Sequence, residues 1–362
     1  MATQSGIYHQ TYASDMQLRP TTWQRIRLAL VIAFVVILPL VVGEGEVRLA
    51  NRVMIAAIGA IGLNILVGYT GQISLGQGAF LAIGAYSAGM LMVYFQTPWV
   101  IALLAASLIT AVLGGVFGLP SLRLKGLYLA VATLAAQQIV QWVIIRWDPV
   151  DGVINGEATD ALRIPANYLF GNEAWRLNDN EYAFYVMIAI ILGIVVLATV
   201  NLFRTHIGRA FIAIRDQDIA AEVMGVNLFQ YKVLAFAVSS FLVGLAGALS
   251  AVHSTAISFE RFTIQVSIEY LAMIIIGGLG TVSGSIYGAI FITLLPEILR
   301  NLGRQIAGTD AGAISEFNRI LPFAQQGAFG VAIVLTLILE PEGIQKIWRN
   351  IKDYFRLFPF SY

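Results

Sequence analysis

The sequence is poor in charged residues and contains no cysteine. Only 12% of its 362 residues are Asp, Glu, Lys or Arg, about half of the 25% that is typical of soluble domains. Hydrophobic residues make up 58%, and the mean hydropathy is +0.77. The lack of cysteine excludes disulfides and thiolate metal sites. Together these features indicate a membrane protein.

The residue patterns of common enzyme sites are also missing. The three histidines, His9, His206 and His253, are scattered along the chain and belong to no metal-binding motif. No Walker lysine motif occurs, so the chain alone cannot hydrolyse ATP. A net charge of +1 without a basic patch gives no sign of nucleic-acid binding. We therefore expect a chain that is not an enzyme and has no catalytic residues, no metal ligands and no cofactor of its own.

Ten apolar segments run along the chain, and several are shorter than the roughly 20 residues that a full membrane span needs. The segments are 28–42, 53–68, 73–95, 99–119, 126–147, 182–203, 233–252, 266–278, 282–299 and 326–339. Short or Gly-interrupted segments are tolerated where neighbouring protein satisfies the backbone. The fold class predicted is therefore an all-α polytopic membrane protein of about ten transmembrane helices, some short or broken.

The loop charges predict that both termini are cytoplasmic. Basic residues precede the first segment, recur at Arg123 and Lys125, fill the loop 204–232 and return in the tail 344–362, whereas the loop 148–181 is acidic. The positive-inside rule then places the basic stretches inside and the acidic loop outside. This gives a polar N-terminal segment 1–25, a permease domain 26–343 and a basic tail. One alternative merges 266–299 into a single long span and places the tail outside.

Two glycine-rich stretches resemble each other. Gly68-Tyr-Thr-Gly71-Gln-Ile-Ser74 and Gly277-Gly-Leu-Gly280-Thr-Val-Ser283 each follow an apolar segment that runs inward in this topology. Gly-interrupted segments at matching places in internal repeats indicate a substrate path, so both turns are expected on the same side. Packing and interhelical hydrogen bonding are the alternative roles. The candidate path residues are Asn64, Gly68, Gly71, Gln72, Ser74, Gln77, Gly277, Gly278, Gly280 and Thr281.

The loop 204–232 carries charges but still has a folded pattern. Ile212, Ile219 and Val223 recur at helical spacing, which predicts a short amphipathic helix. Asp216 or Asp218 is expected to cap its start, and Gly225 to end it. Such a helix on the inner face suits docking of another protein, although a solvated connector is the alternative.

This loop also resembles a known element. Ala220-Ala221-x-x-x-Gly225 is similar to the cytoplasmic EAA loop of ABC-importer permeases, although Ile219 stands where the general pattern has Glu. The string IRDQDIAAEVMGVN, followed by KVLAFAVSSFLVGLAGAL, resembles LivM-type permeases of branched-chain amino-acid importers. The resemblance identifies an ATPase-coupling loop with the residues Arg215, Asp216, Asp218, Ala220, Ala221, Glu222 and Gly225.

The resemblance implies a transporter subunit in the inner membrane of a prokaryote. Its expected partners are a LivH-type second permease, two ATP-binding subunits that hold ATP-Mg, an extracytoplasmic substrate-binding protein and membrane lipid. The acidic loop 148–181 is then expected to meet a basic edge of the binding protein. Branched-chain amino acids are the expected substrates, with urea, short amides or aromatic acids as alternatives. A stand-alone carrier or channel is the alternative from another class.

Overall fold

The structure is a computed structural model that describes residues 22–146, 153–154, 157–158, 162–164, 180–254, 256–307, 311–340 and 343–357. Its helices and four two-residue strands are, in chain order, α2 (Thr22–Val41), α3 (Glu44–Thr70), α4 (Gln77–Tyr94), α5 (Trp99–Gly118), η1 (Leu119–Leu122), α6 (Leu127–Arg146), β1 (Val153–Ile154), β2 (Glu157–Ala158), β3 (Leu162–Arg163), α7 (Glu181–Leu202), α8 (His206–Asp216), α9 (Asp218–Val223), α10 (Leu228–Ser254), β4 (Ala256–Ile257), η3 (Phe259–Phe262), α11 (Ile264–Gly277), α12 (Val282–Ala307), α13 (Ala311–Leu339) and α14 (Ile344–Leu357). Two compact units divide the chain, Met1–Val47 and Arg48–Tyr362.

The all-α class is confirmed, because each of the ten apolar segments forms a helix of its own. Seven of the described helices are long and apolar enough to cross a membrane, and Ile264–Gly277 is a shorter apolar helix. The count of ten spans stays a prediction. The merged span over 266–299 is wrong, because α11 ends at Gly277, α12 begins at Val282, and the two helices pack against each other.

Helix α10 forms the centre of the second unit and packs against α4 and α5. Small residues let these backbones approach closely. A side chain at Gly84 would overlap the backbone of Gly244, and one at Gly247 would overlap the backbone of Leu81. Dispersion between closely packed backbones replaces the hydrophobic drive that lipid removes. The glycines of α4 and α10 therefore serve packing.

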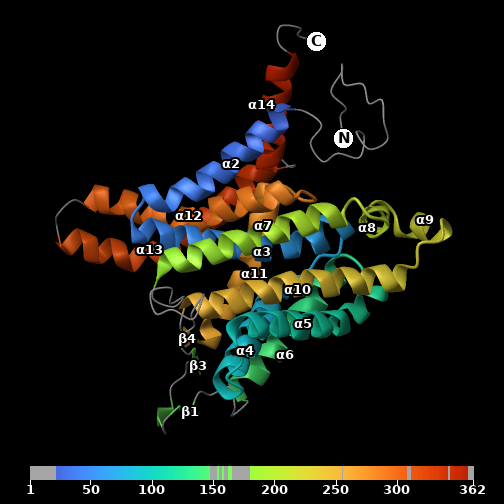
Figure 1. Cartoon of the computed structure of the whole chain (residues 1–362), viewed down its shortest axis with the longest axis horizontal. Helices are drawn as coiled ribbons and strands as arrows, with labels where there is room; N and C mark the ends of the chain where they lie inside the picture. The colour runs from blue at the N-terminus through green and yellow to red at the C-terminus, as the bar shows by residue number, and fades with distance from the viewer. Residues whose placement is uncertain are drawn as a thin grey trace. The chain divides into compact units, whose positions relative to one another are not determined.

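The loops that the sequence places inside meet at one end of the second unit, which we call the loop end. It carries α8 and α9, the chain around Lys125, and Gly343, where an added Cβ would overlap the backbone of Gly278. At the opposite end of α10, β3 pairs antiparallel with β4, with Leu162 opposite Ile257; we call this the strand end (Figure 1). Loops predicted to be cytoplasmic therefore lie together, while the side of the membrane on which they lie stays a prediction.

Parts of the sequence predictions fall outside the described residues. Residues 1–21, most of the loop 148–181 with its acids Asp148, Asp151 and Asp160, and residues 358–362 lie there. The acidic-loop prediction therefore stays a prediction. Within the tail 344–362, residues 344–357 form α14.

Candidate functional site

The loop 204–227 forms two short helices in place of the single amphipathic helix predicted. Helix α8 ends at Asp216, Gln217 is extended with φ −159° and ψ 108°, and α9 begins at Asp218. The extended residue interrupts the helix, so Ile212 and Ile219 lie in two different helices. The predicted short helix between Asp216 or Asp218 and Gly225 corresponds to α9, but the inclusion of Ile212 in it was wrong, because Ile212 lies in α8.

The outward face of α9 is apolar, which the sequence reasoning did not anticipate. Ile219, Val223 and Met224 are 68%, 81% and 85% exposed, whereas Ala221 is 4% exposed and faces the protein. We call these three exposed side chains the apolar ridge. A small residue on the inner face lets α9 lie close to the bundle and leaves its larger apolar side chains uncovered.

The predicted end of α9 is correct, whereas its predicted start is not. Neither Asp216 nor Asp218 caps the start, because Gln217 holds the N-cap position and makes no side-chain cap bond. The expected end is confirmed: Gly225 has φ +89°, its N–H donates to Glu222 O at 2.9 Å, and Val226 N–H donates to Ala221 O at 3.0 Å. This pair of bonds is the Schellman motif.

Asp218 holds the loop against the bundle. Its Oδ2 accepts from Lys125 Nζ at 2.6 Å and from Lys232 Nζ at 3.5 Å, and the Lys232 side chain is almost fully buried. The hydrogen bond from Lys125 holds the pKa of the Asp218 carboxyl below its usual range. Asp218 is thus engaged within this chain, while Asp216 and Glu222 are exposed.

Arg215 joins the coupling loop to both glycine-rich turns. A methyl group at Gly71 would lie 3.6 Å from the Cα and Cγ of Arg215, and one at Gly280 would lie 2.6 Å from its Nη1. Gly71 and Gly280 also share a positive φ, 68° and 71°. The two turns therefore lie on the same side, as the repeat hypothesis requires, but their conformations differ. Helix α3 continues to Thr70 and α4 begins only at Gln77, whereas α11 ends at Gly277 and α12 begins at Val282.

Asn64, a predicted path residue, binds the second turn. Its Nδ2 donates to Thr281 O at 2.9 Å and to Ser285 Oγ at 2.7 Å, and its Oδ1 accepts from Gly280 N–H at 2.9 Å. The side chain is 1% exposed. These bonds tie α3 to the turn between α11 and α12.

The other predicted path residues surround the same two turns. The Nε2 of Gln77 donates to Gly59 O at 3.1 Å, and that of Gln72 donates to Thr70 Oγ1 at 2.9 Å. Ser74 Oγ accepts from Gly76 N–H at 3.3 Å. Gly68 lies against Gly280, while Gly277 and Gly278 lie against Gly343. Most of their polar groups bond within this chain, although the buried Oε1 of Gln72 has no hydrogen-bond partner among the described residues. Their role in a path stays a prediction.

Asn64→Ala is expected to destabilise the fold. The substitution leaves several buried polar groups of the second turn without a partner, which costs about 2–4 kcal/mol in total. Thermal unfolding of the purified protein in detergent measures this loss. Gln138→Ala removes an exposed amide and serves as the control. Equal melting temperatures for the two variants would contradict the assigned role of Asn64.

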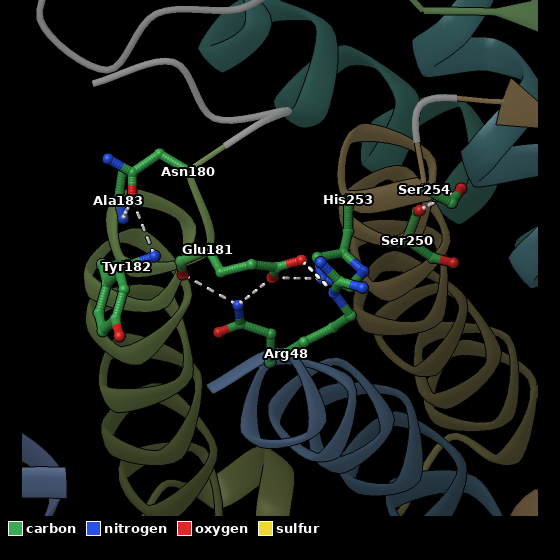
Figure 2. Close-up of polar contacts among 9 residues, drawn as sticks. Arg48, Asn180, Glu181, Tyr182, Ala183, Ser250, His253 and Ser254 are labelled. Carbon is green, nitrogen blue, oxygen red and sulfur yellow. Dashed lines mark hydrogen bonds and ion pairs between the residues drawn. The ribbon is translucent and has the colours of Figure 1, made fainter. Parts of the chain in front are cut away.

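A charged cluster at the strand end was missed by the sequence reasoning. Arg48 Nε donates to Glu181 Oε1 at 2.6 Å, while Asn51 Nδ2 and His253 Nε2 lie 2.9 Å and 3.1 Å from Glu181 Oε2. Figure 2 shows the side chains of Arg48, Glu181 and His253 converging from α3, α7 and α10. The Glu181 side chain is 15% exposed. Hydrogen-bond donors on both of its carboxylate oxygens offset the cost of burying the charge.

A local signal for part of this cluster exists in the sequence. Arg48, Asn51 and Arg52 have the spacing of one helix face at the start of an apolar helix. Glu181 and His253 are 133 and 205 positions away from Arg48 in the sequence, and no local pattern connects them to it.

Comparison with known proteins identifies a transport family. The family model described as branched-chain amino acid transport system, permease component, matches residues 46–339. The chain is 30% identical to the high-affinity branched-chain amino acid transport system permease protein LivM of Salmonella typhimurium and to that of Escherichia coli, over 91% of this chain and 76% of each relative. It is 26% identical to the ribose import permease protein RbsC of Haemophilus influenzae, over 72% of this chain and 78% of that one. No solved structure matches.

Proposed function

This chain belongs to the family of permease components of branched-chain amino acid transport systems, and we propose that it is one of two permeases in an ATP-driven importer. It is a multi-pass protein of the inner membrane. With a LivH-type permease it forms the path for amino acids, most of all Leu, Ile and Val. Two separate subunits bind ATP-Mg and hydrolyse it, and an extracytoplasmic binding protein delivers the substrate.

The apolar ridge is the observation that carries this proposal. Ile219, Val223 and Met224 project from α9, and exposed apolar groups on an otherwise folded loop are typical of a protein interface. The Asp218 ion pairs and the Schellman end at Gly225 hold α9 in a fixed conformation. An ordered helix loses little conformational entropy on docking. The ATP-binding subunit is the proposed partner.

Arg215 supplies a route from the docked helix to the membrane segments. It contacts the two turns that precede α4 and α12, and Asn64 ties α3 to the second turn. A movement of α8 and α9 during ATP hydrolysis therefore reaches α3, α4 and α12 together. Coupling requires that the ATP-binding subunit makes different contacts with this loop in its two conformational states. The exposed acids Asp216 and Glu222 enlarge the surface that is available for these contacts.

Reconstitution in liposomes tests the proposal. Both permeases are inserted together, and uptake of radiolabelled leucine is measured with the binding protein outside, with and without the ATP-binding subunits and internal ATP. We expect uptake only when both the subunits and ATP are present. Uptake without the ATP-binding subunits would identify a stand-alone carrier or channel and overturn the proposal.

A further inference from the structure

A cavity of about 640 Å³ opens at the strand end, away from the coupling loop. Helices α3, α7, α10 and α11 form its wall, together with the end of η3. Its volume lies within the roughly 300–1,000 Å³ range of small-molecule sites. None of the path residues predicted from the sequence lines it.

The cavity carries more positive than negative charge. Arg48, Arg52 and Arg261 line it, against the single carboxylate of Glu181. Glu181 is already engaged by Arg48, Asn51 and His253 (Figure 2). Within the described part of the chain, Arg52 and Arg261 form no ion pair, and both are exposed. Two guanidinium groups at this mouth are therefore available to an anion.

The cavity wall also has an apolar part, beside the polar side chains of Ser250, His253 and Ser254. Ile55, Ala56 and Tyr270 contribute to it, and each is nearly buried. A site that combines exposed cationic groups with buried apolar groups favours a ligand that has an anionic group and a small apolar body. Guanidinium groups bind carboxylates with paired, charge-assisted hydrogen bonds.

We propose that this cavity binds the carboxylate group of the transported solute through Arg52 and Arg261, with the apolar side chain of the solute against Ile55 and Tyr270. Glu181 orients Arg48 and His253 beside the site. The inference rests on the proposed function and narrows its substrate class. Branched-chain and aromatic acids carry the required group, whereas urea and short amides do not.

The test is equilibrium binding to the complete transporter in nanodiscs without the binding protein. The probes are L-leucine, L-leucinamide, which lacks the carboxylate, and 3-methylbutanoate, which lacks the ammonium group. We expect saturable binding of leucine and 3-methylbutanoate and none of leucinamide. The double variant Arg52→Gln, Arg261→Gln is expected to weaken leucine binding at least tenfold. Arg146→Gln, an exposed arginine outside the cavity, is the control and is expected to bind normally.

Several outcomes would overturn the inference. These are equal binding of leucinamide, unchanged leucine binding by the double variant, or loss of binding-protein association alone in that variant. If the transporter imports leucine but binds neither carboxylate probe, the site is rejected and the proposed function stands. Carboxylate binding by a protein that shows no ATP-driven leucine uptake would support the site and reject the proposed function.

Discussion

Aspartate at both Val223 and Met224 is expected to separate the permease from its ATP-binding subunits. These side chains are 81% and 85% exposed, so their replacement leaves the isolated permease folded. Fully burying one such side chain in an interface contributes about 1.5–3 kcal/mol, and a buried unpaired carboxylate adds a further cost. A loss of about 4 kcal/mol weakens association roughly 1,000-fold. Co-purification of the ATP-binding subunits and ATP-driven uptake measure the effect.

His206→Asp is the matched control for this pair of substitutions. His206 begins α8 in the same loop, is exposed, and lies outside the apolar ridge. It introduces a negative charge without removing an apolar contact, so near-normal association is expected. Normal co-purification of the Val223→Asp, Met224→Asp variant would show that the ridge is not the docking surface.

Gly225→Val is expected to uncouple ATP hydrolysis from uptake. Gly225 has φ +89° and nothing lies within 4 Å of an added Cβ, so the strain comes from the backbone and not from a clash. A left-handed conformation costs a β-branched residue about 1–2 kcal/mol or more, and its relief breaks the Schellman bonds that end α9. Uptake should fall at least tenfold while membrane insertion and ATP hydrolysis persist.

Two controls separate strain from side-chain size. Gly225→Asn keeps most of the uptake, because asparagine tolerates the left-handed region. Gly193→Val adds the same side chain where nothing lies within 4 Å and φ is not positive, and is expected to be nearly neutral. Uptake by Gly225→Val at the wild-type level would count against a coupling role for the end of α9.

The sequence predicted the helices well because helix formation by apolar segments depends on local composition. Each apolar segment formed a helix, and the basic stretch at Lys125 met the loop at Asp218. Glycines that require positive φ also mark local conformation, so Gly71, Gly225 and Gly280 could be identified as turn residues. These features follow from a few neighbouring residues.

The errors arose where one residue or a distant contact decided the outcome. Extended Gln217 separates α9 from α8, and Ile219 and Val223 are exposed on α9, which periodicity alone did not predict. The cluster of Arg48, Glu181 and His253 depends on three helices meeting, and that contact has no local pattern in the sequence. The same holds for Arg215, whose position between the two turns became evident only from the fold.

The accessibility and contacts of a thiol at position 224 test the central claim most directly. The chain has no cysteine, so Met224→Cys introduces a unique thiol. We predict that a membrane-impermeant maleimide labels it in inverted vesicles stripped of the ATP-binding subunits, that these subunits protect it, and that intact cells show no labelling. Labelling from outside intact cells, or labelling that the ATP-binding subunits leave unchanged, would contradict the account.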